Sequence, residues 1–415
     1  MSADRLFVES SLRQTVRFTP EGGRTEEDRV RRGVCLEEDV SPSGTAHVAA
    51  DGTELLDSPP HALPPGTVTR AREVLAHQPC GFGPRHTDLL AGLAAESGAV
   101  LTLAGHEQRV LAGSPERPVA DTRTLRTVEV ELPGAGSEVF PWPAPDRPSS
   151  DPAPAAVSEA VRNALEALRA RTTLPPAELP DPVPELVLLP GRAGAFFHEL
   201  VGHPLEGDVV ASGTGYLAKN ARVAPEWLTV DDGAAHGGHG FRARFDDQGT
   251  PTSRTPLIRE GRLRGPLNDL ATARLTGTPP TGNGRRLDYG FPAVPRMTHT
   301  RAFCARPGTL PEGPWIAPLG LSLERMGIAT GEFVFVAHHP LLYSGRSPAA
   351  RLPRLRISGS AGRVLAGLRP GPGGLRGYTR ASKGCGKLGQ FPLIVSFANS
   401  GLRLPAGLVE VTPDV

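Results

Sequence analysis

The chain has little of several features that would point to a specialised class of protein. Its 45 Lys and Arg residues are balanced by 44 Asp and Glu residues, for a formal net charge of +1, and only Lys219, Lys383 and Lys387 are lysines. A balanced charge gives no electrostatic support for binding nucleic acid or an anionic membrane surface. The four cysteines are too few for a disulfide framework and include no Cys-x-x-Cys pair. We therefore expect neither a nucleic-acid partner nor a disulfide scaffold.

Long apolar runs are also missing. No segment approaches the roughly 18 apolar residues of a membrane helix, and the first residues, MSADRLFVESS, contain no apolar signal core. This predicts a cytoplasmic protein with no membrane segment. Gly and Pro, by contrast, are abundant at 49 and 44 residues, which favours turns and short strands over a helical bundle. A chain of 415 residues is long enough for two domains.

The pattern of residues 1–180 predicts an α+β domain, an N-terminal α/β unit with a mainly antiparallel sheet. Alternating apolar residues over 5–19 predict two short strands around a turn. An amphipathic helix is expected over 156–171, followed by a Pro-rich break at 174–185 that places the domain boundary near residue 180. Further strands are expected at 33–39, 45–51, 98–105, 107–113 and 126–132, and helices at 67–78 and 87–97.

Residues 181–415 predict a β-rich domain. Short strand candidates follow one another between Gly-containing turns, and helical crossovers long enough for a parallel α/β fold are missing, so a curved sheet or partly closed barrel is expected. The segment GPGG (371–374) is interpreted as a loop, because a phosphate-binding loop needs a strand-to-helix context and a Lys-Ser/Thr pair. The apolar run LVLLP (186–190) is expected to be a strand that leads into the chemically informative segment AGAFFHELVGHPLEGD (193–208).

This segment contains the pattern His-Glu-x-x-x-His, formed by His198, Glu199 and His203. Two imidazoles suit a zinc ion, and a carboxylate beside the first ligand suits a general base for hydrolysis. In an ideal α-helix, residues five apart point about 140° away from each other. We therefore expect a distorted helix, with Gly202 adopting unusual backbone angles and Pro204 ending the helix. The alternative is a helix end with surface histidines and a salt-bridged glutamate.

A hydrolytic zinc site needs a third protein ligand and one position left for water. Cys385, in ASKGCGKLGQ, is the best candidate. Gly384 and Gly386 allow a tight loop around it. Lys383 and Lys387 would favour its thiolate form.

Other residues could also serve this site. His236 with His239, and His338 with His339, are rival pairs of ligands, although each pair is more typical of loop or strand-end histidines without a metal. The acidic residues of LEGD (205–208), Glu206 and Asp208, could orient the ligands or serve only as a turn and helix cap.

Several segments resemble, in order, the motifs of the TldD/PmbA peptidases, and in particular their metal-bearing TldD branch. The resemblance extends over most of residues 190–400 and is looser in the N-terminal region. The matching segments are HELVGHPLEGD (198–208), RVAPEWLTVDDG (222–233), DDQGTPTSRTPLIREGRLRGPLNDLATARLTG (246–277), TGNGRR (281–286), PRMTHT (295–300), TGEFVF (330–335) and CGKLGQ (385–390).

The resemblance implies a zinc-dependent peptidase with an N-terminal α/β domain and a β-rich catalytic domain. It implies one zinc ion held by His198, His203 and Cys385, with Glu199 as the catalytic base. It further implies unfolded or unstructured peptides as substrates, including leader peptides, bound as an added strand. The expected assembly is a heterodimer with a metal-free TldE/PmbA-like relative, or a homodimer.

The chain departs from the family pattern at some positions. His299 stands in PRMTHT where an Asn is expected, and residues 337–346 and 346–377 diverge. Two alternative functions stay open at this point. One is a metal-dependent amide hydrolase acting on a peptide-like metabolite in a biosynthetic pathway. The other is a non-catalytic partner subunit, which would not need the complete set of His, Glu, His and Cys.

Overall fold

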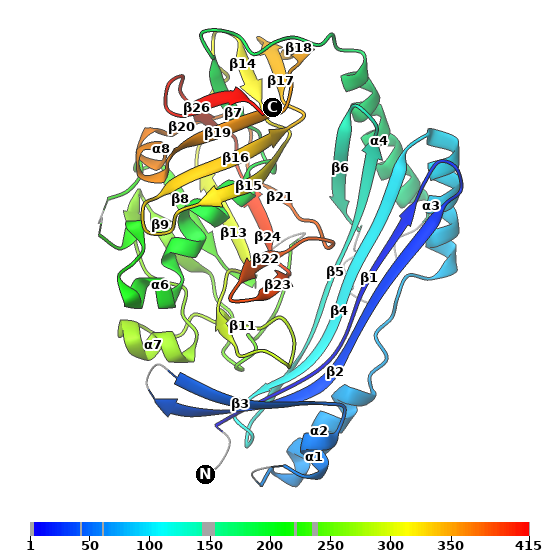
Figure 1. Ribbon diagram of the computed structural model, residues 1–415, viewed down its shortest axis with the longest axis vertical. Coiled ribbons are helices and arrows are strands. Elements are labelled where there is room, and N and C mark those ends of the chain that lie inside the picture. The colour runs from blue at the N-terminus through cyan, green and yellow to red at the C-terminus, as the bar shows by residue number, and fades with distance from the viewer. Residues whose placement is uncertain are drawn as a thin grey trace.

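We describe the protein from a computed structural model, in residues 4–41, 44–59, 62–142, 154–219, 222–234 and 240–414. A sheet of long N-terminal strands runs beside a β-rich C-terminal part (Figure 1). The ligand candidates His236 and His239 lie outside the described residues. Within the described residues, no helix combines the length and apolar character needed to cross a bilayer.

The N-terminal sheet is antiparallel throughout. Its strands are β1 (Arg5–Phe18), β2 (Arg24–Ser41), β3 (Gly44–Asp51), β4 (Val100–Gly113), β5 (Val119–Leu132) and β6 (Gly136–Pro141), in the order β3-β2-β1-β4-β5-β6. The prediction of two short strands in 5–19 was wrong, because β1 is continuous. Ser10 and Ser11 at its centre are buried and pair with both β2 and β4, so no turn forms there. For the same reason β4 is one strand rather than two.

Helices cover one face of this sheet, and the C-terminal domain covers the other. The helices are α1 (Glu54–Asp57), α2 (Pro65–Ala76), α3 (Pro84–Ser97) and α4 (Pro154–Thr172). Alternation along β1 explains this division. Leu6 and Val8 join the core beneath α1 and α2. Phe7 lies on the opposite face beside Tyr289, and the Tyr289 backbone N–H donates to Glu9 over 2.7 Å.

The C-terminal strands are divided among several sheets around one core. The first sheet is β10 (Arg262–Leu263), β9 (Thr255–Arg259), β8 (Leu228–Asp232), β13 (His299–Cys304), β24 (Ser396–Asn399) and β21 (Arg376–Tyr378). The second is β18 (Ser347–Arg351), β17 (Leu341–Ser344), β14 (Trp315–Ala317), β7 (Glu185–Leu188), β25 (Leu402–Leu404) and β20 (Arg369–Pro370). The third is β15 (Gly320–Met326), β16 (Glu332–His338), β19 (Leu355–Ser360) and β26 (Glu410–Pro413).

Two short ribbons and a few short helices complete this domain. The ribbons are β11 (Gly284–Arg285) with β12 (Val294–Pro295), and β22 (Cys385–Lys387) with β23 (Gln390–Leu393). The helical segments are α5 (Gly194–Phe197), η1 (His198–Gly202), η2 (His203–Leu205), α6 (Gly207–Ser212), η3 (Tyr216–Lys219), α7 (Leu270–Thr276) and α8 (Ala361–Gly367).

The core of the C-terminal domain holds the segment that carries the His-Glu-x-x-x-His pattern. Phe196 and Phe197 of α5 are buried, and Phe196 packs its ring against Phe333 and Phe335 of β16 at centroid distances of 5.6 and 5.3 Å. Such aromatic contacts fix the start of η1. The predicted α+β class, with an antiparallel N-terminal sheet and a β-rich C-terminal domain, is confirmed.

Candidate metal centre

The helix that carries the two histidines changes its winding between them. From His198 to Gly202 the chain forms a π turn, in which the His203 N–H donates to the His198 carbonyl five residues earlier. A bond over five residues brings positions i and i+5 together, as an α-helix does for i and i+4. The rings of His198 and His203 consequently lie with centroids 4.9 Å apart.

The distortion has a different cause from the one expected. Gly202 has ordinary right-handed angles, φ −63° and ψ −62°, and His203 remains helical at φ −58° and ψ −42° in spite of Pro204. The prediction of unusual angles at Gly202 was therefore wrong. Gly202 is needed for space, because a Cβ there would lie 2.7 Å from the Met297 sulfur. Pro204 has no N–H, and the Leu200 carbonyl accepts from the Tyr216 hydroxyl instead.

The structure brings Cys385 to the two histidines. One donor atom each from His198, His203 and Cys385 lie within 4.8 Å of one another. The Cys385 sulfur is 3.1 Å from His203 Nε2, and the side chains are buried or nearly so. The preceding residue must be small, because a Cβ on Gly384 would approach the Leu393 carbonyl oxygen to 2.4 Å.

Hydrogen bonds at Nδ1 orient both imidazoles. His203 Nδ1 lies 3.1 Å from Glu206 Oε2. His198 Nδ1 lies 3.4 Å from the Thr300 hydroxyl, which itself donates to Asp232 over 3.0 Å. These contacts place the proton of each ring on Nδ1 and leave Nε2 as the donor atom for a metal.

The donor set fits a zinc ion. His198 Nε2 is buried and has no hydrogen-bond partner among the described residues. A buried polar atom without a partner is unfavourable unless something else satisfies it. Burial, followed by the charge of His203, lowers the pKa of His198 well below its ordinary value, so the ring is neutral as a ligand must be. Two imidazoles and one thiolate are ligands that zinc prefers.

A second layer of charged groups supports His203. The Glu206 carboxylate is 1% exposed and accepts from Lys387 Nζ over 2.9 Å, and Lys387 also reaches Asp208 over 2.7 Å. Burial favours the neutral acid, but His203, Lys387 and Arg296 together lower the pKa of Glu206 below its ordinary value. Lys387 was expected to favour the thiolate of Cys385. Its hydrogen bonds instead join the carboxylates behind His203.

Glu199 lies between this cluster and the solvent. Its side chain is 17% exposed, and Oε2 is 3.7 Å from His203 Nε2. Burial raises the pKa of Glu199 above its ordinary value. A carboxylate of increased basicity, beside the donor atoms and open to a cleft, is suited to accept a proton from water.

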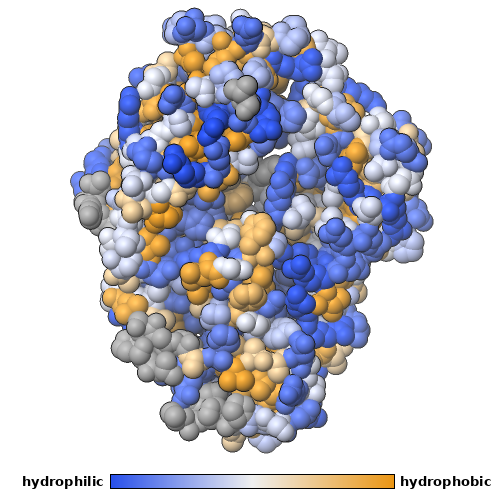
Figure 2. All heavy atoms as spheres, in the orientation of Figure 1, coloured by the Kyte–Doolittle hydropathy of each residue, from blue (hydrophilic) through white to orange (hydrophobic). Residues whose placement is uncertain are grey.

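That cleft lies between the two domains and has a volume of about 450 Å³. Its lining includes Glu199, Phe397 and Gly320–Ser322 of β15, but none of the three donor residues. We call Glu199 and the adjoining metal centre the floor of the cleft, and the rest of its lining the walls. Since β15 is the terminal strand of its sheet, one of its edges is unpaired among the described strands (Figure 1). Hydrophilic side chains border the hollow between the domains on both sides (Figure 2).

Comparison with known proteins identifies a family that the C-terminal part of the chain resembles. Residues 184–369 match the family described as the PmbA/TldA metallopeptidase C-terminal domain. By these residues, the C-terminal part of the chain is similar to this family's domain. A metalloprotease of Synechocystis is 33% identical over 227 residues, which cover 53% of this chain and 48% of that protein. A zinc metalloprotease TldD homologue of Saccharolobus solfataricus is 32% identical over 116 residues, which cover 28% and 26%.

The chain thus spans about half the length of the first of these relatives, and about a quarter of the second. The similarity to a solved structure covers more of the chain. The crystal structure of TldE from Thermococcus kodakarensis aligns with 97% of this chain and 95% of its own, at a TM-score of 0.65 and 14% identity. At this identity the alignment shows that the fold is shared.

The remaining candidate histidines that the structure describes lie elsewhere. His338 and His339 line the cleft, where His338 Nε2 is 2.7 Å from the Ser322 hydroxyl, but neither joins the cluster of donor atoms. His299 is buried, with Nδ1 2.7 Å from the Ser396 hydroxyl. Among the candidate third ligands that the structure describes, Cys385 alone joins His198 and His203.

Sequence reasoning missed the residues that hold His198 in place. Asp232 and Thr300 occur in the motifs RVAPEWLTVDDG and PRMTHT, which carried the family resemblance, but no role was assigned to them. Their contact depends on the register of β8 and β13, in which Asp232 and Thr300 are direct partners. Arg296 was also missed. It is fully buried, with Nε 3.8 Å from Glu206 Oε1.

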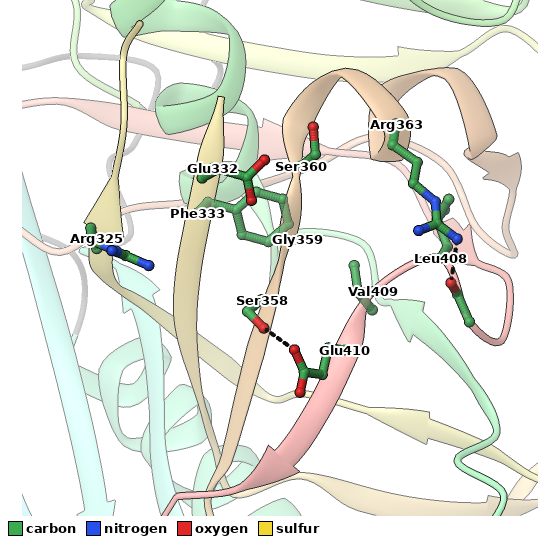
Figure 3. Close-up of a pocket in the computed structure, with 11 residues that line it drawn as sticks. Arg325, Glu332, Phe333, Ser358, Gly359, Ser360, Arg363, Leu408, Val409 and Glu410 are labelled. Atoms are coloured by element: carbon green, nitrogen blue, oxygen red, sulfur yellow. Dashed lines mark hydrogen bonds between the residues drawn. The ribbon is translucent and has the colours of Figure 1, made fainter. Parts of the chain in front are cut away.

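A second hollow, of about 500 Å³, lies on the sheet that contains β16 and β19 (Figure 3). It is lined by none of the donor residues of the metal centre. Two of its polar side chains are hydrogen-bonded within the hollow: Ser358 donates to Glu410 over 3.3 Å and Arg363 to the Gly407 carbonyl over 2.9 Å (Figure 3). The functional site is therefore assigned to the cleft between the domains.

Proposed function

We propose that this chain is a zinc-dependent peptidase of the TldD/PmbA family. His198, His203 and Cys385 hold one zinc ion, and Glu199 is the general base. The observation that carries this proposal is the convergence of the three donor atoms within 4.8 Å, beside a carboxylate that faces the cleft. The metalloprotease names of the relatives support it.

When bound, zinc supplies a Lewis acid that polarises a carbonyl and lowers the pKa of water. The rest of the chemistry belongs to the chain. Glu199 accepts a proton from the water whose oxygen attacks the peptide carbonyl carbon. It then returns that proton to the leaving amine nitrogen as the C–N bond breaks. Thr300 and Glu206 hold the imidazoles of His198 and His203 at Nδ1. Burial disfavours the charged ring of His203, but the charge of Glu206 outweighs burial and raises the pKa of His203 above its ordinary value, so His203 would release a proton from Nε2 when it binds zinc.

The unpaired edge of β15 supports an extended substrate. A peptide that adds to this edge gives its backbone hydrogen bonds to the strand, a mode of binding that depends little on sequence. A folded protein cannot present an extended backbone to a cleft of about 450 Å³. Unfolded or unstructured peptides, including leader or precursor peptides, are therefore the proposed substrates. We further propose a cytoplasmic protein that works as a heterodimer with a metal-free relative, or as a homodimer.

Cleavage of unstructured peptides by the purified protein, followed by mass spectrometry, tests this proposal. A chelator should abolish cleavage and added zinc should restore it. Glu199→Gln should retain zinc while cleavage falls by at least about 100-fold, the range expected for loss of a general base. Glu178→Gln, at an exposed position outside the cleft, is the matched control. Full activity of Glu199→Gln would contradict the role of the base.

The same experiment separates the alternative functions. A protein that binds zinc but cleaves only small peptide-like amides would be a metabolite hydrolase. A protein that binds peptides but cleaves none, with or without zinc, would be a partner subunit. The complete donor set with Glu199 beside it opposes the second alternative, because a subunit that only binds needs no such arrangement.

A further inference from the structure

The walls of the cleft carry many charged side chains, and these are contributed by both domains. Backbone pairing along β15 would not distinguish one peptide from another, so any selectivity must come from such groups. The cations that line the cleft are Arg171, Arg192, Arg380 and Lys383, and the carboxylates are Glu129, Glu131 and Glu199.

Some of these charges are balanced within the protein. Arg380 lies 3.0 Å from Glu129. Glu131 is 49% exposed and lies 3.7 Å from Arg17, so solvent screens it at the rim. Glu199 lies at the floor, where it belongs to the metal centre. Arg380 with Glu129, Glu131 at the rim and Glu199 therefore contribute little net charge to the surface that a substrate would contact.

Two places on the walls keep an excess of positive charge. Arg171 and Arg192 both bind the single carboxylate of Glu138, so two guanidinium groups share one negative charge. Lys383 is exposed two residues before Cys385, and its ammonium has no hydrogen bond or ion pair within the described part of the chain. The excess charge therefore lies at two places in the lining of the same cleft.

We infer that the cleft selects peptides that carry carboxylates, which bind at Lys383 and at the Arg171–Arg192 pair. This inference rests on the proposed peptidase function and narrows its substrate class. The carboxylate can belong to an Asp or Glu side chain or to the C-terminus of the peptide. A guanidinium pair suits either source, because its planar N–H groups match the geometry of a carboxylate.

Peptides that differ only in charge test the inference. We would compare one unstructured sequence that carries Glu, Gln or Lys at matched positions, with both ends blocked. The Glu peptide should exceed the Lys peptide by about tenfold in kcat/KM, mostly through KM, and the difference should shrink at high salt because exposed charges are screened. Comparing kcat/KM for a neutral peptide with a free C-terminus and for its C-terminal amide shows whether the C-terminal carboxylate is also recognised.

Variants assign the effect to residues. Lys383→Glu should abolish the preference, because the new carboxylate offsets the excess charge of the Arg171–Arg192 pair. Arg192→Gln should weaken the preference because Arg171 is then neutralised by Glu138. Arg346→Gln, an exposed position between β17 and β18 outside the cleft, should leave the preference unchanged. Thermal unfolding of each variant shows whether Arg192→Gln still folds. If it does not, Lys383→Glu still tests the inference, because Lys383 is exposed and its replacement should not disturb the fold.

Binding to the Glu199→Gln protein, measured by fluorescence anisotropy of the same peptides, separates this inference from the peptidase proposal. Tighter binding of acidic peptides without cleavage by the unmodified enzyme would contradict the peptidase and keep the selectivity. Equal affinity for Glu and Lys peptides would overturn the inference. It would also be overturned by a preference that persists unchanged in both Lys383→Glu and Arg192→Gln.

Discussion

The floor and the walls of the cleft differ in how deeply their side chains are buried and in how firmly neighbouring residues hold them. On the floor, His198 is buried and His203 nearly so, and each is held through a second residue, His203 by Glu206 and His198 by Thr300. On the walls, Lys383 is exposed and has no such support in the described structure. Leaving a buried polar group without its partner costs about 1–3 kcal/mol, whereas an exposed ion pair contributes about 0–1 kcal/mol.

This difference indicates which property each region controls. Groups on the floor are fixed in orientation, as metal binding and proton transfer require. An exposed group on the walls, such as Lys383, can change without disturbing the fold, so the identity of the preferred peptide can change while the chemistry stays the same. Substitutions on the floor should therefore affect metal and rate, and those on the walls should affect only the choice of substrate.

The largest effect is expected from Cys385→Ala, which removes a proposed ligand from the floor. Zinc affinity should fall by more than the roughly 10–100-fold that loss of a supporting group costs, and peptide cleavage should fall with it. Elemental analysis after dialysis measures the zinc content. Cys80→Ala, at an exposed cysteine, is the control and should keep one zinc per chain. A Cys385→Ala protein that still holds one zinc would remove Cys385 from the ligand set.

A smaller effect is expected from Glu206→Gln, which keeps the size of the side chain but removes the charge that holds His203 and Lys387. Zinc affinity, measured by competition with a chelator, should fall about 10–100-fold. Asp208→Asn should cost less, because Asp208 is 38% exposed and contacts Lys387 rather than a histidine. Equal losses in the two variants would show that His203 does not depend on Glu206.

The sequence predicted the residues of the floor better than the contacts that hold them. His198, Glu199, His203 and Cys385 were all named as candidates, because their side chains have few chemical roles and the motif places three of them in one turn. The structure brings the donor atoms of His198, His203 and Cys385 together, and the roles of the four residues stay predictions. Asp232 and Thr300 were not, since their contact requires the register of two strands far apart in the chain. The carboxylates that Lys387 binds depend on the orientation of the β22–β23 ribbon relative to η2 and α6, which local sequence does not specify.

The N-terminal domain shows the same limit. Alternation along β1 correctly indicated strand, but the polar centre at Ser10 and Ser11 was interpreted as a turn. Those residues pair with β2 on one side and β4 on the other, and the neighbours of a strand are not visible in its own pattern. The predicted domain boundary near residue 180 stays a prediction. It falls between α4, which packs on the N-terminal sheet, and β7, which belongs to a C-terminal sheet.

The strand that carries Thr300 should make stability depend on pH through His299. Burial, followed by the charge of Arg301, lowers the pKa of His299 to about 4. A depressed pKa contributes stability that is present above the ordinary histidine pKa and is lost as the pH falls toward 4. Between pH 7 and pH 5 this amounts to about 2 kcal/mol.

Urea unfolding of the wild type and of His299→Asn at these two pH values measures this contribution. The comparison uses the change in unfolding free energy between the two pH values, which does not depend on the absolute stability of either protein. The wild type should lose about 2 kcal/mol more than the variant, because other titrating groups are common to both. An identical loss in the two proteins would show that His299 is charged or accessible in the folded state.

The smallest effect is expected from Gly202→Ala, which tests why the π turn carries a glycine. The backbone angles at Gly202 suit any residue, so the cost must come from the contact that a Cβ would make 2.7 Å from the Met297 sulfur. Because a methionine side chain is flexible, Gly202→Ala should destabilise the protein by only about 1 kcal/mol. Truncating the neighbour in Gly202→Ala/Met297→Ala should remove this penalty when compared with Met297→Ala alone. A penalty that persists in the double variant would mean that the backbone itself requires glycine, and that the turn between the two histidines is strained after all.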